Sequence, residues 1–511
     1  MRKYNKKLAT QIDFILVQIF FLTFLFIATN SYCQNNDTVQ ARHKVTLPEA
    51  HIGDLEIDTK LLDSYDLLPA NVRQFYFDAR AVFSEIPDAD FNQPKILESA
   101  QKHEIVLMGH PMLGNLKPDG VTLWLRPATS GPFLLVVKNN NGISEKVIPI
   151  KSVQPGVAKK VVVNELASDQ NYSYEILSQK QVLAKGTFTT APKKGSQGEF
   201  RLTFGSCFHK IGIHNPNLVN QIIARNPKAM MLLGDIAVDD RENNIAMHRS
   251  DYLLRDLSKS WQELAANIPL FTSWDDHDYL NNDLSGMPDG ITSESRERLR
   301  MVWRQNWNNP EPDGEGIYFN TRIGPVEIIM LDTRSCRTIN KRGEYSSFLG
   351  INQQNWLKNT LKNSTAPFKI ISSGTMWSDD VSNGKDSWGS WDTGAREEIF
   401  SFIERYQISG VILLSGDRHG ARSFTIPRKN GHRFYEFEVA TLGGVPGPDA
   451  MAPNAENQLF GYDGERFIAF GEFTFNTSGE QPTLVFRLIN QYGQILEEIP
   501  LSYDMLTPPG I

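Results

Sequence analysis

The sequence predicts an α/β module preceded by a small all-β module of the immunoglobulin or fibronectin kind. Two patterns of hydrophobic residues along the 511-residue chain lead to this prediction. Between His103 and about Pro192, short runs of alternating hydrophobicity are separated by turns, which is typical of a β-sandwich. From residue 199 onward, apolar runs that fit buried strands alternate with helical stretches, as in an open α/β sheet.

The composition excludes several other classes of protein. The chain is 40% hydrophobic and 22% charged, which is an ordinary globular balance and not that of a disordered, collagenous or coiled-coil protein. Its net charge of −7 argues against binding nucleic acid or anionic membranes by charge alone. Three cysteines are too few for a disulfide scaffold.

Residues 1–33 have the layout of a secretory signal peptide. A basic start, with Arg2 and Lys3 among its residues, precedes an apolar core over 14–28, and Ser31 and Cys33 occupy positions −3 and −1 of a cleavage site. We therefore expect an exported protein (periplasmic, cell-surface or extracellular) with no transmembrane segment after cleavage. The alternative is an uncleaved anchor helix, although the apolar core is shorter than the roughly 20 residues that a span needs.

Three further segments follow the expected signal peptide. Residues 34–104 are predicted to form an N-terminal extension with one amphipathic helix, over 71–83. Residues 105–192 form the predicted β-sandwich, and a linker by composition, over 191–198, leads into the predicted catalytic domain, 193–511. The strands expected in the β-sandwich cover residues 121–126, 133–138, 160–164, 172–177 and 183–190.

In the α/β module, five apolar runs each end in polar residues. These runs cover 200–204, 229–233, 269–274, 326–331 and 411–415. Helices are expected between them, at 217–226, 252–266 and 397–405, and strands at 467–476, 483–490 and 495–501 should extend the sheet. Because open α/β sheets place their sites at the carboxyl ends of strands, we expect the polar residues after these runs to converge on one crevice.

The polar residues at these strand ends combine thiol, imidazole and carboxyl groups. They are Cys207, His209, Asp235, Asp275, Asp276, His277, Asp278, Asp417 and His419. Several carboxylates brought together without a cation would repel one another, and a metal centre removes that conflict. Taken singly, a Gly-Asp pair is more often a turn or a helix cap, and a single cysteine is more often a small core residue. The ordered set therefore indicates a metal site more strongly than any one member.

As a set, these motifs resemble the alkaline phosphatase D (PhoD-like) family of metallophosphatases and phosphodiesterases. The resemblance rests on Gly205-Ser206-Cys207, Gly234-Asp235, Asp275-Asp276-His277-Asp278, Asp332-Thr333-Arg334 and Ser415-Gly416-Asp417-Arg418-His419, and it covers about residues 105–500. It implies an α/β metallophosphatase sandwich with the β domain ahead of it.

The resemblance also implies a site with two or more metal ions, iron together with calcium. In that site Asp235 bridges the ions, and the terminal ligands are Cys207, Asp276, Asp417 and His419. His277 is the catalytic residue that protonates the leaving oxygen or stabilises the transition state, since imidazole titrates near neutral pH.

Two positions leave the ligand set open. Val238 stands where relatives carry a tyrosine ligand, so either Asp239 or Asp240 substitutes for it or the ion differs. His209 is either an additional ligand or a surface residue.

Arg418 and Arg334 are candidates for contacts with the substrate phosphate, because a guanidinium binds phosphate oxygens in pairs. Each is equally compatible with a structural ion pair.

The predicted function is hydrolysis of phosphate monoesters, diesters or both by a metal-bound hydroxide. The expected partner is a small phosphoester, and no sequence-specific binding of nucleic acid is expected. No oligomeric state is predicted. The alternatives are an exported metal-binding surface protein without catalysis, and a metal-free histidine phosphatase that uses Arg418-His419-Gly420.

Overall fold

The computed structural model describes residues 38–381, 386–453 and 455–510, so the predicted signal peptide lies outside the described residues. Within these ranges no helix is both long and apolar enough to cross a membrane.

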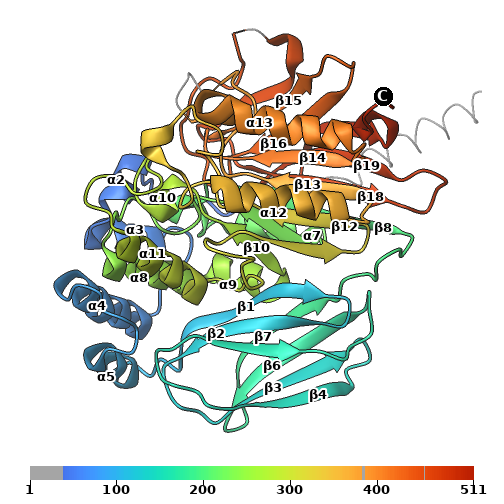
Figure 1. Cartoon of the computed structure of the whole chain (residues 1–511). Coiled ribbons are helices and arrows are strands. Elements are labelled where there is room, and N and C mark those ends of the chain that lie inside the picture. The colour runs from blue at the N-terminus through green and yellow to red at the C-terminus, as the bar shows by residue number, and fades with distance from the viewer. Residues whose placement is uncertain (1–37, 382–385, 454, 511) are drawn as a thin grey trace, which may run out of the picture. The chain divides into compact units, whose positions relative to one another are not determined.

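Two large β-sheets pack face to face and form the centre of the fold (Figure 1). The nine-stranded sheet contains, in spatial order, β20 (Ile495–Ser502), β19 (Thr483–Asn490), β18 (Ala469–Asn476), β8 (Glu199–Gly205), β9 (Ala229–Leu233), β10 (Leu270–Ser273), β1 (Leu107–Lys117), β2 (Gly120–Pro127) and β5 (Lys159–Val163). The seven-stranded sheet contains β11 (Phe319–Ile323), β12 (Val326–Met330), β13 (Phe368–Ser372), β14 (Val411–Ser415), β16 (Arg433–Val439), β15 (Gly420–Pro427) and β17 (Gln458–Asp463).

The central strands of both sheets are parallel, which confirms the predicted α/β arrangement. The parallel sets are β8, β9 and β10 in one sheet and β12, β13, β14 and β16 in the other. Phe204 and Met231 of the first sheet share one buried core with Ile370 and Ile412 of the second. Parallel strands of this kind are buried on both faces, because helices cover the sides that do not meet.

Helices cover the outer faces of both sheets. On the seven-stranded sheet, α12 (Gly350–Asn363) and α13 (Trp388–Arg405) share a second buried core with the strands beneath them (Figure 1). On the nine-stranded sheet, the covering helices are α7 (Pro216–Ala224), α8 (Ile245–Leu257), α9 (Lys259–Asn267) and α11 (Ser293–Asn306).

The predicted helix over 252–266 is wrong in one respect, because two helices occupy this segment. The chain breaks at Ser258, which is extended (φ −69°, ψ 123°) and whose hydroxyl caps α9 at the Trp261 amide. The apolar periodicity continues across the break, so sequence periodicity alone does not reveal it.

A separate antiparallel sheet precedes the α/β strands in the chain, as predicted. Its strands, in spatial order, are β4 (Ser144–Ile150), β3 (Phe133–Asn139), β6 (Asn171–Ser178) and β7 (Gln181–Thr189). Leu135 and Ile176 on this sheet share a core with Leu123 on β2. The second layer of this small sandwich is formed by β1, β2 and β5, and a single parallel bridge from Gly114 to Leu270 joins that layer to β10.

The expectation of one helix in the N-terminal extension is wrong. The extension contains α2 (Leu47–Ile52), α3 (Leu55–Leu62), α4 (Ala70–Glu85) and α5 (Pro94–Lys102), of which α4 is the predicted helix. The other three are too short for a clear 3.6-residue period, and their starts depend on local capping. Thr46 and Glu49 form a capping box at α2, and the Asp54 carboxylate caps α3.

Candidate metal centre and active site

The predicted site residues meet where strands of both sheets end. Cys207 and His209 follow β8, Asp235 follows β9, Asp276 and His277 lie in α10 (Asp276–Tyr279) after β10, and Asp417 and His419 follow β14. Within each sheet the neighbouring strands run parallel, so their carboxyl ends share one edge of that sheet, as expected for an α/β fold.

Several of these residues adopt backbone angles that L-amino acids rarely use. Residues with φ between 43° and 75° at the site are Cys207, His209, Asp235, Asp240, Asp417 and His419. Each such residue costs about 1–3 kcal/mol, which the surrounding structure must offset. In these turns the backbone directs successive polar side chains inward, so the strain is part of how the site is built.

Gly234 lets the ends of β9 and β10 approach each other. Its φ is 108°, and a Cβ at this position would collide with the backbone and side chain of Asp275. The Asp278 carboxylate then accepts hydrogen bonds from the amides of Asp235 (2.5 Å) and Ile236 (3.1 Å). These hydrogen bonds hold the backbone turn that carries Asp235, and so they fix the direction of its side chain.

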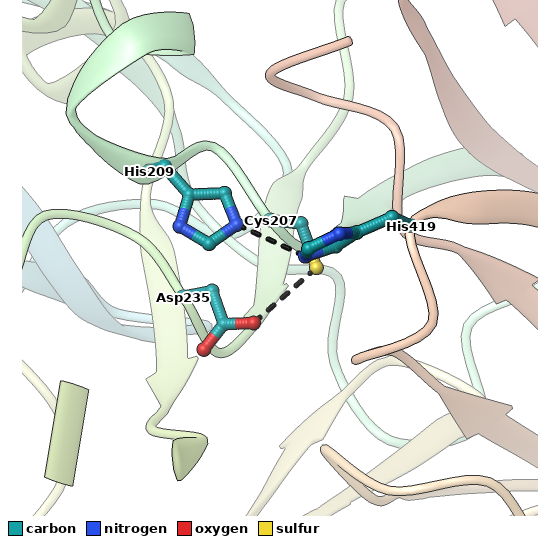
Figure 2. A group of neighbouring side chains, drawn as sticks. All are labelled: Cys207, His209, Asp235 and His419. Carbon is teal, nitrogen blue, oxygen red and sulfur yellow. Dashed lines mark hydrogen bonds between the residues drawn. The ribbon is translucent and has the colours of Figure 1, made fainter. Parts of the chain in front are cut away.

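The first cluster contains Cys207, His209, Asp235 and His419 (Figure 2), with one ligand atom from each residue within 4.8 Å of the others. Cys207 Sγ lies 3.4 Å from Asp235 Oδ2, and the two histidines face each other with their Nε2 atoms 3.2 Å apart. The cluster lies between the two sheets, since His419 follows a strand of the second sheet and the other three follow strands of the first.

The hydrogen bonds of the two imidazoles define their tautomers. His419 Nδ1 donates to the Pro446 carbonyl (2.8 Å), and His209 Nδ1 donates to Asp239 Oδ1 (2.8 Å). Both partners only accept, so in the neutral rings both Nε2 atoms carry lone pairs. Burial lowers the pKa of His419 to about 3, which keeps its ring neutral. Two imidazole nitrogens this close share either one proton or a metal ion, and together with the thiol and the carboxylate beside them they form a donor set that fits a metal ion.

The second cluster consists of carboxylates and shares Asp235 with the first. Its members are Asp235, Asp275, Asp276 and Asp417. Asp235 Oδ1, Asp276 Oδ1 and Asp417 Oδ2 are buried and have no hydrogen-bond partner among the described residues. Burial and the neighbouring Asp276 carboxylate raise the pKa of Asp235 and that of Asp417 well above their ordinary values. A cation relieves both the repulsion and the missing partners, so these residues fit a second metal ion.

His277 is oriented by a carboxylate that precedes it in the sequence by 37 residues. Its Nδ1 donates to Asp240 Oδ1 at 2.7 Å. Burial opposes the imidazolium form, but the charges of Asp276 and Asp235 outweigh it and raise the pKa of His277 well above its ordinary value. The ring is 3% exposed and therefore holds its proton among carboxylates rather than in water.

The four-residue tract after β10 contains two structural residues as well as site residues. Asp278 caps the turns described above, and Asp275 pairs with Arg334, whose Nη2 lies 2.9 Å from Asp275 Oδ2. Asp276 accepts from the Asp283 amide through Oδ2 (2.6 Å) and directs Oδ1 into the carboxylate cluster. Asp275 thus lies near the carboxylate cluster, but its carboxylate is already paired with the guanidinium of Arg334.

The two candidate phosphate-binding arginines differ in their surroundings. Arg334 is fully buried and pairs with Asp275 and Asp386, its Nη1 lying 2.5 Å from Asp386 Oδ2. Its Nη2 also lies 3.5 Å from Asp276 Oδ1 and 4.0 Å from Asp417 Oδ1. Arg418 is only partly buried, and its Nε has no hydrogen-bond partner in the part of the chain that the structure describes. The geometry therefore favours the structural alternative for Arg334 and leaves Arg418 available for a ligand.

Asp239 contacts His209 and, together with His51 and His209, forms a further group whose ligand atoms lie within 4.8 Å of one another. Its Oδ1 accepts from His209 Nδ1 and its Oδ2 accepts from the Lys210 amide at 3.1 Å. Val238, the position of the expected tyrosine, is a fully buried apolar side chain. The two cysteines in the described residues, Cys207 and Cys336, are both free thiols.

One residue at the site is absent from the sequence prediction. His51, in α2 of the N-terminal extension, lies with its ring centroid 4.7 Å from that of His277 and 5.8 Å from that of His209. Burial lowers its pKa. A single histidine in a polar segment carries no sequence signal that links it to a site about 160 residues further on.

Comparison with known proteins gives consistent findings. A family model described as PhoD-like phosphatase matches residues 224–457. Alkaline phosphatase D of Bacillus subtilis (strain 168) is 25% identical over 383 residues, which cover 60% of this chain and 63% of that relative. The chain thus spans less than two thirds of that relative's length. These findings confirm the resemblance to the PhoD-like family that the motifs predict.

Two solved structures share the fold. A structure of PhoD superposes with a TM-score of 0.58 at 17% identity, covering 76% of this chain and 92% of that chain. Purple acid phosphatase PPD1 from yellow lupin (Lupinus luteus) seeds gives a TM-score of 0.57 at 14% identity, and the match covers 77% of this chain and 74% of that chain. The α/β sandwich is therefore the metallophosphatase fold, as predicted.

Proposed function

We propose that this chain, whose residues 224–457 match the model of the PhoD-like phosphatase family, is a metal-dependent phosphoesterase. The observation that carries the proposal is the pair of imidazole nitrogens, His209 Nε2 and His419 Nε2, that face each other 3.2 Å apart beside Cys207 and Asp235. Together these four side chains place sulfur, nitrogen and oxygen ligand atoms within 4.8 Å of one another, as a metal ion requires.

The two clusters suit two different ions. Cys207, His209 and His419 offer sulfur and nitrogen, which favour a transition metal such as iron. Asp276 and Asp417 offer only oxygen, which favours a hard cation such as calcium. Asp235 belongs to both clusters and is the proposed bridge. Such a pair of ions polarises the phosphoryl oxygens and lowers the pKa of water at the site.

His277 is the proposed proton donor to the leaving oxygen. Because Asp240 accepts from Nδ1, Nε2 is the ring nitrogen left to carry and transfer a proton. After transfer, the neutral ring remains fixed by the same hydrogen bond.

Arg418 is the proposed contact to the substrate phosphate. It follows Asp417 directly and is partly exposed, and its Nε lacks a partner within the described ranges. A guanidinium in this position neutralises charge on the phosphoryl oxygens. Arg334 acts in this proposal through Asp275, not on the substrate.

Metal content and hydrolysis measured on the same samples test the proposal. The wild-type protein, Asp235→Asn and the exposed control Asp289→Asn are assayed with p-nitrophenyl phosphate and bis(p-nitrophenyl) phosphate, and their metals are determined by elemental analysis. We expect Asp235→Asn to lose both metal and turnover, and the control to keep both. An Asp235→Asn protein with full metal and full turnover contradicts the proposed centre.

The same experiment separates the alternatives. A metal-loaded wild-type protein that hydrolyses neither ester is a binding protein. Activity that persists after chelation, with phosphate trapped on His419, identifies a histidine phosphatase. The two substrates also report whether monoesters or diesters are preferred.

Export of the protein is also proposed, from the signal-peptide features of residues 1–33. Fractionation of cells that express the full chain, followed by N-terminal sequencing, tests it. A product that stays inside the cell and retains Met1 contradicts it.

A further inference from the structure

A side chain of the N-terminal extension, His51, reaches the candidate active site. Its Nδ1 lies 3.2 Å from Asp240 Oδ2, while the other oxygen of the same carboxylate accepts from His277 Nδ1. The rings of His51 and His277 are tilted by only 34° with centroids 4.7 Å apart. One carboxylate therefore lies between two imidazoles, one from the extension and one from the α/β fold.

We propose that the N-terminal extension takes part in the reaction site, and that His51 is a positioning residue that holds Asp240 and, through it, the proton donor His277. This inference rests on the proposed function. It assigns a role in catalysis to the described part of the extension.

The segment that carries His51 is held tightly. Gly53, at the end of α2, has a φ of 54°, and a Cβ there would collide with the side chains of Arg241 and Lys210. The Gly53 carbonyl accepts from Arg80 Nη2, and the Ile52 carbonyl accepts from Arg241 Nη1. The backbone beside His51 is thus bonded to the catalytic domain itself.

A buried charge network beneath α2 connects the extension to the site. Asp58 accepts from Tyr76 (2.8 Å) and Arg80 (2.7 Å), all three residues belonging to the extension. Lys210 Nζ lies 3.5 Å from Asp58 Oδ1 and 3.6 Å from Asp251 Oδ1. Asp58, Lys210 and Asp251 have fully buried side chains.

The catalytic-domain end of this network adjoins the metal cluster. Asp251 pairs with Arg241 at 2.7 Å, and Lys210 directly follows His209 in α6 (His209–Gly212), against which α2 packs. Buried charges that are paired in this way define one geometry, because each loses its partner if α2 shifts.

The geometry of Asp240 explains why it needs a second partner. Its backbone is in the left-handed region (φ 54°), and Oδ1 already accepts from His277 Nδ1 and from the Asn282 amide (3.0 Å). Only Oδ2 remains to resist rotation of the carboxylate, and His51 faces it. Outer partners of this kind are typically worth 10- to 100-fold in activity. The Asp240 side chain is 20% exposed, so water replaces part of the contact and we expect the lower end, about 10-fold.

Leaving-group dependence distinguishes positioning of a proton donor from general damage. A p-nitrophenolate leaves without protonation, whereas an alkoxide needs the proton from His277. We compare a p-nitrophenyl ester with an alkyl ester of the same phosphoryl group for the wild type, His51→Ala and His51→Asn. His43→Ala is the matched control, since His43 is an exposed histidine of the same extension.

We expect His51→Ala to lower kcat for the alkyl ester about 10-fold, with KM and metal content unchanged, and to affect the p-nitrophenyl ester far less. His51→Asn should recover part of this loss, because its amide nitrogen occupies the place of Nδ1. Thermal unfolding of each variant shows whether it has folded.

Three results would overturn the inference. If the His51→Ala variant lowers kcat equally for both esters, His51 has only a structural role. If the variant matches the wild type on both esters, His51 has no role. Loss of a metal equivalent in His51→Ala makes His51 a ligand instead. If the wild type hydrolyses neither ester, the proposed function fails first, and this outcome is separate from the other three.

Discussion

Replacing Arg334 with glutamine should destabilise the protein more than it weakens substrate binding. Arg334 is fully buried and pairs with Asp275 and Asp386, whose side chains are 1% and 4% exposed. Removing one partner from a buried ion pair costs about 3–5 kcal/mol, because the remaining charge has neither water nor a counterion. Asp386 keeps Arg337 at 2.7 Å, but among the described residues Asp275 forms no ion pair with a second arginine. The Arg334→Gln substitution should therefore lower the free energy of unfolding by about 3–5 kcal/mol.

The destabilisation should depend on pH in a defined direction. Burial raises the pKa of Asp275 to about 6 even with Arg334 beside it, and removing the arginine raises it further. The pKa of such a carboxyl is higher in the folded than in the unfolded protein, so its protonated form stabilises the folded state at low pH. This stabilisation is lost as the pH rises through the folded-state pKa. The deficit of Arg334→Gln should thus be small near pH 5 and largest near pH 8.

Urea unfolding followed by tryptophan fluorescence, at both pH values, measures this deficit, and steady-state kinetics measure KM. The control is Arg418→Gln, for which we expect a change in stability below about 1 kcal/mol and a raised KM. The conclusion that Arg334 is a structural residue would be refuted if the Arg334→Gln protein kept wild-type stability near pH 8 but bound substrate tenfold or more weakly.

Three further predictions concern the turn, the carboxylate cluster and the proton donor. Gly234→Ala should lower the unfolding temperature and the metal content, whereas Gly290→Ala, also at positive φ but in open space, should cost only about 1 kcal/mol; differential scanning calorimetry and elemental analysis compare them. The chelated protein should lose stability as the pH rises from about 5 to 8, because the raised pKa values of Asp235 and Asp417 make their ionisation unfavourable; thermal unfolding with and without chelator measures the slope. His277→Gln should lower kcat roughly 10²- to 10⁴-fold without loss of metal, measured on an alkyl phosphoester.

Each of these has an outcome that contradicts it. Equal effects of the two glycine substitutions would show that crowding against Asp275 is unimportant. A chelated protein whose stability is independent of pH would mean that the carboxylates are already neutralised by protein groups. A His277→Gln protein with unchanged kcat would remove that residue from the reaction.

The site depends on compensation between strained turns and the contacts around them. Cys207, Asp235 and Asp417 adopt left-handed backbone angles directly after buried strands. The sheets hold the strand ends apart at a constant spacing, and Asp278 bonds the amides of the Asp235 turn. Mutation of such supporting residues should therefore affect the metal centre without touching an ion.

The strands that end in site residues, and the identity of most of those residues, could be predicted because both are local properties, whereas β13 (Phe368–Ser372) was not predicted. Runs of apolar residues followed by Gly234-Asp235 or Gly416-Asp417 show where a strand ends and which polar group comes next. Parallel strands bring their carboxyl ends to one edge, so the convergence of Cys207, Asp235 and His419 follows from the fold class.

Roles within the tract after β10 could not be predicted in the same way. Asp275, Asp276 and Asp278 are chemically identical and adjacent, yet one pairs with Arg334, one faces the carboxylate cluster and one caps a neighbouring turn. Their partners lie up to about 60 residues away in the chain. The side-chain directions set by the short helix α10 decide which residue meets which partner.

By itself, the sequence determined the α/β fold class and the chemical mixture of thiol, imidazole and carboxyl groups at the strand ends. Only the tertiary structure decided that Arg334 is a buried counterion and that His51 joins the site from the extension. The physical reason is that periodicity and motifs report each segment's own preferences. A contact between segments far apart in the chain depends on how their buried charges and close-packed surfaces fit once the chain has folded.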